Sequence, residues 1–424
     1  MNKICEIHRN FDPSCFETDI AQAIDWLAEY GSEPDGGVTR LLYSPAWQEA
    51  QTALARRMEA AGLAARFDDC GNLYGRLEGR GPEREVILTG SHVDTVPSGG
   101  KYDGAYGILA GMIALEFLYE NFGPPLRTLE VVSLCEEEGS RFPLAYWGSG
   151  NLTGRYAIHT PPDIADADGI TLQAAMNAAG FGLGTFPPPK RADIARFIEL
   201  HVEQGFVLEK ERAAIGIVQG IVGQRRYTVQ VGGSANHAGT TPMKYRHDAL
   251  LGACEMIEWM EKKALHKTEP FVSTVGQLHV KPNSSNVIPG EVAFTVDIRD
   301  AHAAALQEFS GEFPEAFARI AARRGLTVDI GEWMNMAPIM MNGEMNAALA
   351  AICRRRNLPF RMMFSGAGHD TQVIGEMCPA TMLFVPSRAG ISHSPREYSE
   401  TKDLAAGVAV LAEWLYKYGY TDSD

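Results

Sequence analysis

The sequence lacks the features that would tie it to a membrane or to an oxidising compartment. No apolar run approaches the length of about 20 residues needed to span a bilayer, and Met1–His8 lacks the apolar core of a signal peptide. The seven cysteines are dispersed and form no CxxC pair and no close-spaced framework, which suits a reducing compartment. We therefore expect a soluble, cytoplasmic protein.

Positive charge is also scarce. The 53 acidic residues outnumber the 38 lysines and arginines and give a formal net charge of −15. This balance argues against a nucleic acid or an anionic membrane as partner. It does not bear on a small anionic substrate, because a local basic patch can oppose the net sign. The 424 residues exceed what one hydrophobic core usually supports, so we expect at least two domains.

Polar side chains follow two short apolar runs that read as buried strands. The run Glu85–Thr89 leads into His92 and then Asp103, and the run Leu129–Leu134 leads into three consecutive carboxylates, Glu136–Glu138. Sites in open α/β sheets are built where strands end. Three carboxylates that leave a strand are poor candidates for core packing, so these strand ends are candidate functional positions.

Imidazole and carboxylate groups at strand ends are typical ligands of zinc or manganese, and a carboxylate can bridge two ions. His92 and Asp103 are therefore candidate metal ligands, with Asp103 as the bridge. Asp94 lies two residues after His92 and could orient its ring without touching the metal. A surface loop made of ordinary turn residues explains His92 and Asp103 about equally well.

Two later strand ends favour the metal centre over the loop. His201 lies inside the apolar strand pattern of residues 197–202, and the run 381–385 leads into a loop that contains His393. A lone histidine of this kind is more often a satisfied polar residue at a strand edge than a ligand. Four such strand ends in one chain make that explanation less convincing.

Taken together, these motifs resemble the dinuclear metallo-acylase and carboxypeptidase superfamily. Within it, the resemblance is to the branch of allantoate amidohydrolases, N-carbamoyl-L-amino acid hydrolases and β-ureidopropionases, and it covers nearly the whole chain. The motifs are His92-x-Asp94, Tyr102-Asp103-Gly104, Glu136–Phe142, Glu199-Leu200-His201-x-Glu203-Gln204-Gly205 and Ser392-His393-Ser394.

The resemblance implies a metal-dependent hydrolase with two divalent ions, zinc or manganese. It implies that Glu137 is the general base, which takes a proton from a water shared by the ions and returns it to the leaving nitrogen. The implied ligands are His92, Asp103 and His201 for one ion, and Asp103, Glu138 and His393 for the other.

The chain order predicts an inserted domain. Residues 16–67 show helical spacing and Leu73–Leu77 reads as the first strand, whereas residues 224–332 read as strand, helix, strand, strand, helix, strand, the ferredoxin-like order. Because the inserted segment holds none of the implied ligands, we expect an α/β fold. A metal-binding domain with a central mixed sheet, over residues 1–223 and 333–424, is interrupted by a smaller α+β domain. The resemblance implies that this domain acts as a lid and forms a homodimer.

The resemblance also implies a substrate pocket. His237 and Asn286 would reach the substrate and help stabilise the oxyanion, from the same or from the partner subunit, and Arg299 would pair with a substrate carboxylate. Gln224 and His369 would complete the pocket. Without the resemblance, the glycines and the proline around His237 favour an ordinary loop.

The expected substrate is a ureido acid. The run Glu136–Pro143 followed by Tyr146–Ser149 looks closer to bacterial allantoate amidohydrolases than to the carbamoyl-amino acid enzymes. Hydrolysis of allantoate to ureidoglycine, ammonia and carbon dioxide, a step of purine catabolism, is therefore the expectation. N-carbamoyl-L-amino acids and N-carbamoyl-β-alanine are the alternative, an aminoacylase or peptidase is less favoured, and a non-catalytic binding protein would not need Glu137 beside a full ligand set.

Overall fold

A computed structural model describes residues 11–81 and 85–422. The segment Met1–His8, on which the expectation about a signal peptide depends, lies outside these residues. The described chain divides into two compact units. The larger unit takes its residues from Met1–Gln219, Met341–Met363 and His369–Asp424, and the smaller unit takes Gly220–Met340 and Phe364–Gly368.

The larger unit is built on a nine-stranded mixed sheet in the order β1-β2-β4-β3-β5-β15-β6-β13, with β14 beside β6. Its four central strands, β4, β3, β5 and β15, are mutually parallel, so their carboxyl ends meet at one edge of the sheet. The strands are β1 (Ala64–Phe67), β2 (Leu73–Leu77), β3 (Val86–His92), β4 (Thr128–Leu134), β5 (Ile194–Val202), β6 (Ile215–Ile221), β13 (Ile339–Met340), β14 (Phe360–Ser365) and β15 (Ala380–Val385).

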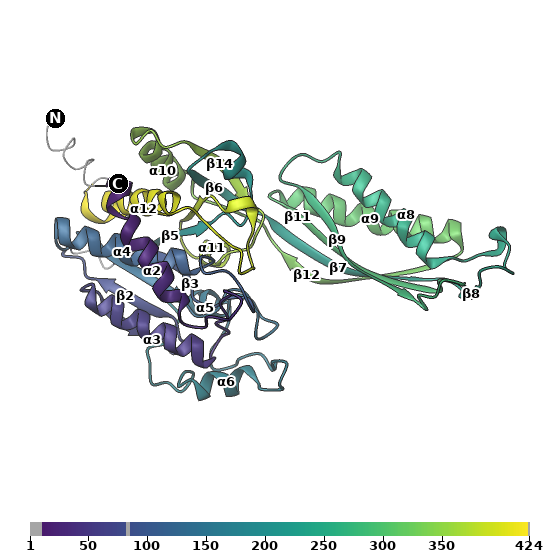
Figure 1. The fold of residues 1–424 in the computed structure, drawn as a ribbon, viewed down its shortest axis with the longest axis horizontal. Coiled ribbons are helices and arrows are strands. Elements are labelled where there is room, and N and C mark those ends of the chain that lie inside the picture. The colour runs from purple at the N-terminus through teal and green to yellow at the C-terminus, as the bar shows by residue number, and fades with distance from the viewer. Residues whose placement is uncertain (1–10, 82–84, 423–424) are drawn as a thin grey trace. The chain divides into compact units, whose positions relative to one another are not determined.

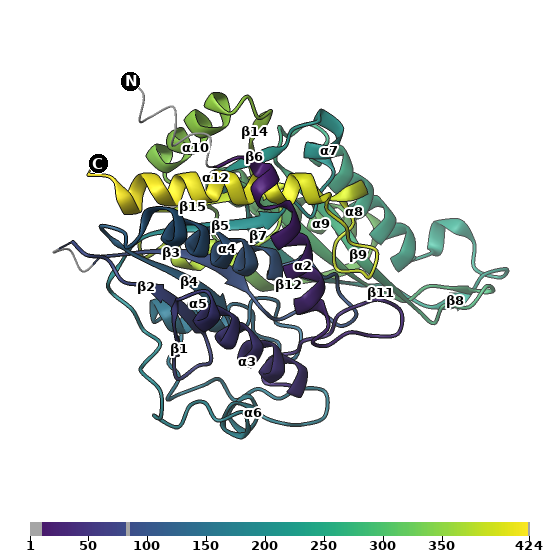
Figure 2. The same cartoon turned by 60° about the vertical axis from the view of Figure 1, so that its left-hand side comes forward.

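Two long helices cover the centre of this sheet. The side chains of α4 are buried on almost every side, because α4 packs against β3, β4 and β5 and also against α12 (Figure 2). The helices of the unit are η1 (Pro13–Cys15), α2 (Glu17–Ala28), α3 (Pro45–Ala60), α4 (Ala105–Phe122), α5 (Trp147–Thr153), α6 (Leu172–Ala178), α7 (Val207–Glu211), α10 (Gly343–Arg355), α11 (Asp370–Ile374), η3 (Arg388–Gly390) and α12 (Thr401–Tyr420) (Figure 1).

One element was missed by the sequence pattern. Residues 16–67 contain α2 and α3 as expected, but the first strand is β1 at Ala64–Phe67 and not Leu73–Leu77, which is β2. The strand β1 is four residues long, lies at the sheet edge and buries none of its side chains fully. Such a short, half-exposed strand has no alternation that could distinguish it from the end of a helix.

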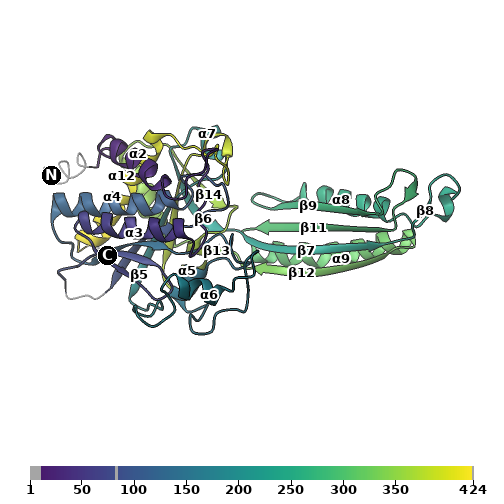
Figure 3. The ribbon, with the colours of Figure 1, turned by 60° about the horizontal axis from the view of Figure 1, so that its bottom comes forward.

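The smaller unit holds a four-stranded antiparallel sheet in the order β12-β7-β11-β9 (Figure 3). Its main elements follow the ferredoxin-like chain order, and it extends beyond 224–332 at both ends because β7 begins and β12 ends outside those limits. The elements are β7 (Gly223–Gly232), β8 (Asn236–His237), η2 (Met243–Tyr245), α8 (Ala249–Ala264), β9 (Val272–Lys281), β10 (Val287–Ile288), β11 (Glu291–Asp300), α9 (Ala303–Arg324) and β12 (Thr327–Met336).

Within the described residues of the smaller unit, helices cover one face of this sheet. Along β11, Phe294, Val296 and Ile298 are buried in a core shared with α8 and α9. The alternate residues, including Asp297 and Arg299, are half-buried and lie on the opposite face. The smaller unit therefore has one sheet face lined by polar side chains. The predicted α/β class with a large mixed sheet is confirmed by the larger unit. No helix within the described ranges is long and apolar enough to cross a membrane.

A buried carboxylate ties the outer strands of the large sheet together. Glu130 on β4 is fully buried and accepts hydrogen bonds from Arg76 at 2.8 Å, Arg191 at 2.9 Å and Arg66 at 3.3 Å. Arg191 is itself only 9% exposed. Loss of the charge of Glu130 leaves Arg76 and Arg191 with Glu78 and Asp193 as their ion-pair partners and removes the buried acceptor that the arginines share, which costs more than the pairing contributes.

We expect Glu130→Gln to lower the free energy of unfolding of the larger unit by about 3 kcal/mol. Asp25→Asn is the matched control. It removes the same charge from the pair with Lys101, in which Asp25 is 71% exposed, and should change the stability by less than about 1 kcal/mol. Urea denaturation followed by tryptophan fluorescence measures both, and equal midpoints for the two variants would contradict the role of Glu130.

Candidate metal centre

The parallel strands bring the predicted ligands to one edge of the sheet. His92 is the last residue of β3, His201 is the penultimate residue of β5, and Glu138 follows β4. His393 lies in the loop after β15, and Asp103 lies in the turn that leads into α4. All five candidate ligands fall into groups whose donor atoms lie within 4.8 Å of one another. The sequence placed these residues at strand ends, and the common direction of the strands brings them together.

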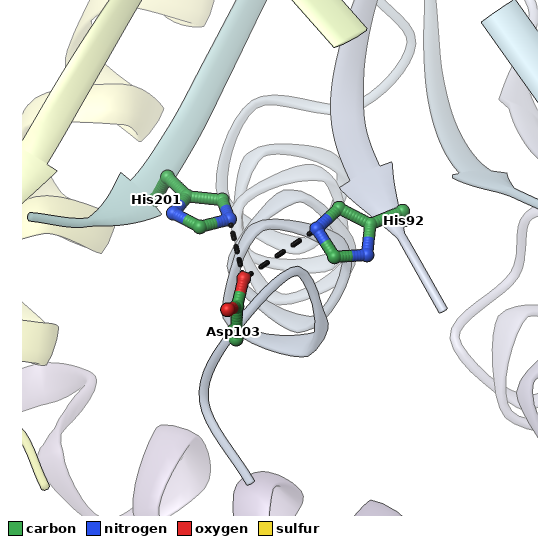
Figure 4. A group of neighbouring side chains, drawn as sticks. All are labelled: His92, Asp103 and His201. Atoms are coloured by element: carbon green, nitrogen blue, oxygen red, sulfur yellow. Dashed lines mark ion pairs between the residues drawn. The ribbon is translucent and has the colours of Figure 1, made fainter. Parts of the chain in front are cut away.

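One carboxylate oxygen of Asp103 faces two histidines (Figure 4). Its Oδ1 atom is 3.1 Å from Nε2 of His201 and 3.5 Å from Nε2 of His92. Asp103 and both imidazole rings are almost fully buried, at 5% exposed or less. Three donor atoms from separate elements therefore converge on one small volume.

The protonation of the two rings leaves a place for a cation. Nδ1 of His92 lies 3.1 Å from the carbonyl oxygen of Asp94, and Nδ1 of His201 lies 2.9 Å from that of Val202. Because a carbonyl only accepts hydrogen bonds, Nδ1 carries the proton in the neutral form of each ring, and Nε2 carries the lone pair, which in His201 also accepts the backbone N–H of Gly104 at 3.1 Å. A lone pair and a carboxylate oxygen repel each other unless a proton or a metal ion lies between them, so this group fits a cation.

The other oxygen of Asp103 faces a second group. Oδ2 is 3.2 Å from Nε2 of His393, and the same nitrogen is 3.3 Å from Oε1 of Glu138. These two hydrogen-bonded carboxylates raise the pKa of His393 to about 10. Within the described residues, the ion pairs of Asp103 and Glu138 are with histidines alone. The donor set thus fits two metal ions with Asp103 between them.

Gly104 allows Asp103 to reach this position. Its φ of +63° is in the left-handed region, and a Cβ atom there would lie 2.4 Å from a ring carbon of His92. Any other residue would be strained and would push the imidazole away. The glycine that follows Asp103 is therefore part of the geometry of the site.

Asp94 holds the two neighbouring glutamates in place. Its Oδ1 accepts the backbone N–H of Glu137 at 2.9 Å, and its Oδ2 accepts that of Glu138 at 3.1 Å. Oδ1 also lies 3.3 Å from Nδ1 of His92. The residue predicted to orient His92 thus also fixes the loop that carries the candidate base and one candidate ligand.

Glu137 lies in an environment that favours its neutral form. Burial, together with the negative charge of Glu138, raises the pKa of Glu137 well above its ordinary value. One of its carboxylate oxygens belongs to a group with His92 and Glu138. A nearby divalent cation would favour the ionised form, which is the form that a general base requires.

Three residues beside the candidate ligands were not predicted as site residues. Glu397 accepts the backbone N–H groups of Tyr102 and Asp103 at 3.0 and 3.1 Å and the hydroxyl of Ser392 at 2.7 Å. Gln204 donates its side-chain amide to Oδ2 of Asp103 at 2.8 Å. Gln204 and Ser392 lie within the quoted motifs and could have been suspected, whereas no motif surrounds Glu397.

His369 lies beside the metal candidates. Its ring centroid is 4.7 Å from that of His201, and it forms a group with His201 and Glu199. Burial and the neighbouring imidazole of His201 lower the pKa of His369 well below its usual range. His369 is therefore a neutral ring within the larger unit, and a contact with substrate stays a prediction.

Four predicted substrate residues belong to the smaller unit, where they form two groups. His237 and Asn286 are brought together by the pairing of β8 with β10, and the backbone N–H groups of Gly239 and Thr240 donate to Nδ1 of His237. The accepting Nδ1 leaves the proton of the neutral ring on Nε2, where it can serve as a donor.

The second group is Gln224 and Arg299, which share Asp297 as an acceptor. Gln224 donates its side-chain amide to Asp297 at 2.7 Å, and Arg299 donates to both carboxylate oxygens at 3.0 and 3.1 Å. Gln224 is thus held by Asp297, and the direct substrate contact predicted for it stays a prediction.

Comparison with known proteins identifies the family. The sequence matches the peptidase family M20/M25/M40 over residues 88–417. It is also 47% identical over 404 residues to the allantoate amidohydrolase of Bacillus subtilis, which covers 95% of this chain and 98% of the relative. The chain belongs to this family. The predicted superfamily and the prediction of a hydrolase are thereby confirmed.

Further relatives fall in the same branch. The N-carbamoyl-L-amino-acid amidohydrolase of Paenarthrobacter aurescens is 37% identical over 394 residues, with 92% of this chain and 95% of the relative covered. A solved amidase of the hydantoinase/carbamoylase family from Burkholderia multivorans has a TM-score of 0.92 at 34% identity and covers 96% of this chain and 98% of its own. Membership of the M20 family, together with the donor groups described above, points to divalent metal ions.

Proposed function

We propose that this protein is an allantoate amidohydrolase, which converts allantoate to ureidoglycine, ammonia and carbon dioxide. The observation that carries the proposal is the split of the Asp103 carboxylate between two groups of ligand atoms, in a chain that is 47% and 45% identical to two bacterial allantoate amidohydrolases. The first group is His92, Asp103 and His201, and the second is Asp103, Glu138 and His393.

Two zinc or manganese ions held by these residues would acidify a water molecule and polarise the carbamoyl carbonyl. Glu137 accepts the proton of that water and returns it to the leaving nitrogen as the carbamoyl C–N bond breaks, and the carbamate that results decomposes with release of carbon dioxide. His237 donates from Nε2 to the oxyanion, and Arg299 holds the substrate carboxylate. Asp94 keeps the backbone of Glu137 in place throughout, because it accepts its N–H.

Steady-state kinetics tests the substrate. We expect the kcat/KM for allantoate to exceed those for N-carbamoyl-L-methionine and N-carbamoyl-β-alanine, to vanish after exhaustive chelation, and to return with Mn²⁺ or Zn²⁺. A higher value for either carbamoyl compound would identify an N-carbamoyl-amino acid hydrolase or a β-ureidopropionase instead. Full turnover by protein whose metal content is near zero would contradict the metal centre itself.

Glu137 and Glu138 are expected to respond differently to the same substitution. Glu137→Gln should lower kcat by at least about a hundredfold and leave the metal content unchanged, because the base is lost and the ligands remain. Glu138→Gln should lower the metal content, because an amide is a weaker ligand than a carboxylate. Metal analysis and kinetics on the two variants measure this, and equal metal loss in both would show that the roles are wrongly assigned.

We also propose that the protein is a homodimer formed through the smaller unit. The strand β9 lies at the edge of the four-stranded sheet, and its Val272 and Leu278 are 50% and 45% exposed. An unpaired edge that exposes apolar side chains is a template for pairing with another chain. Sedimentation velocity should show a dimer for the wild type and a shift towards monomer for Leu278→Lys, and a monomeric wild type at micromolar concentration would refute the proposal.

A further inference from the structure

A carboxylate on the open face of the smaller sheet has an unusual number of donors around it. Asp297 on β11 lies opposite Arg226 on β7, and Arg299, two residues further along β11, lies opposite Gln224. The four side chains thus form a block on two neighbouring strands. Arg226, Asp297 and Arg299 line a hollow of about 810 Å³, which Thr274 and Trp333 also line.

The donors converge on the two oxygens of Asp297. Its Oδ1 accepts Nε–H of Arg299 at 3.0 Å. Its Oδ2 accepts from Nη2 of Arg299 at 3.1 Å, from Nε of Arg226 at 2.8 Å and from the amide of Gln224 at 2.7 Å. Burial raises the pKa of Asp297, but the bonds and charge of Arg299, with the bonds of Arg226 and Gln224, outweigh it and lower the pKa.

The bonds to Asp297 use only one side of the Arg299 guanidinium. Nε and Nη2 form its side edge, and both are engaged by the carboxylate. Nη1 donates to the carbonyl oxygen of Gly366 at 2.7 Å. A guanidinium has five N–H groups in one plane, so one N–H on Nη1 and one on Nη2 are left over. These two can donate in parallel to a planar carboxylate.

The charges of the block also do not cancel. Asp297 supplies one negative charge to two guanidinium groups, which leaves one net positive charge on this face of a chain whose formal charge is −15. Arg226 also contacts the ring of Trp333, with the Cζ atom of Arg226 5.5 Å from the centroid of the ring. A site with one surplus positive charge is suited to a monoanion.

We propose that Asp297 is a positioning residue, which fixes the guanidinium of Arg299 so that its two remaining N–H groups point at the carboxylate of a ureido acid. Asp297 acts through Arg299 and does not touch the substrate. The inference rests on the proposed function, because it takes the ligand of Arg299 to be the carboxylate of the substrate. It gives a structural cause for the requirement that the ligand present a free carboxylate and not merely a carbonyl group.

Binding can be measured without turnover in metal-loaded protein that carries Glu137→Gln. The probes are N-carbamoylglycine, the simplest ureido acid, and its carboxamide, which keeps the ureido group and lacks the charge. We expect Asp297→Asn to weaken the binding of N-carbamoylglycine about tenfold or more in isothermal titration. The Asn side chain has an NH₂ group where Asp297 has a carboxylate oxygen, so a hydrogen-bond donor would face the N–H groups that an acceptor now binds. Binding of the carboxamide should not change.

Arg299→Ala should weaken N-carbamoylglycine binding at least as much, and Asp297→Asn added to it should cause no further loss. Glu291→Gln is the matched control, since Glu291 lies on the same strand and pairs with Lys281 on the exposed surface. It should leave both affinities unchanged.

Three results with the variants would overturn the proposal. The first is an unchanged affinity of Asp297→Asn for N-carbamoylglycine. The second is an equal loss of affinity for the carboxamide, which would mean that Asp297 has a merely structural role. The third is a loss of affinity in the double variant that equals the sum of the losses caused by Asp297→Asn and Arg299→Ala. An absence of N-carbamoylglycine binding in the parent would also overturn it. Failure of the proposed substrate is separate, because it is measured as the turnover of allantoate by the wild type.

Discussion

Negative charge gathered at the carboxyl ends of the parallel strands is the constraint on which the larger unit depends. Asp103 and Glu138 are held among imidazoles, and within the described chain neither has a lysine or arginine as an ion-pair partner. Such a group of acids is costly to bury unless cations neutralise it. The neighbouring structure holds these acids in place. Gly104 leaves room for Asp103 beside His92, and the carboxylate of Glu397 accepts the backbone N–H of Asp103. The carboxylate of Asp94 accepts the backbone N–H groups of Glu137 and Glu138.

Two residues beside Asp103 have a strained backbone. Gln204 and His393 have φ values of +57° and +52°, in the left-handed region that side chains other than glycine rarely adopt. Both lie in loops beyond strand ends, and both side chains contact Asp103. Residues in sparsely populated conformations persist where the surrounding structure over-determines them, and they often mark functional sites. The loops after β5 and β15 thus hold these two side chains against Asp103.

The smaller unit meets the opposite electrostatic requirement. An acidic chain that is to bind an anion needs a local surplus of positive charge, and the arginine pair around Asp297 supplies it with a single carboxylate. The open sheet face makes this arrangement available, because cross-strand neighbours on β7 and β11 lie on the same side and the helices cover only the other side. The polar block is thus a product of strand register.

Much of this could be predicted from the sequence alone. Apolar runs located the central strands, the order of elements indicated a ferredoxin-like insertion, and the histidines and Asp103 near strand ends were candidate ligands, because these signals are local. The role of Glu138 and the division of the ligands between two ions came from the resemblance to a known family. The four-residue strand β1 was missed since it has too little pattern. Only the tertiary structure revealed that Glu397 supports Asp103, 294 residues away in sequence, and that Gln224, Arg226 and Arg299 converge on Asp297. Contacts of this kind depend on strand direction and register, which are set by the packing of distant segments and leave no trace in the spacing of nearby residues.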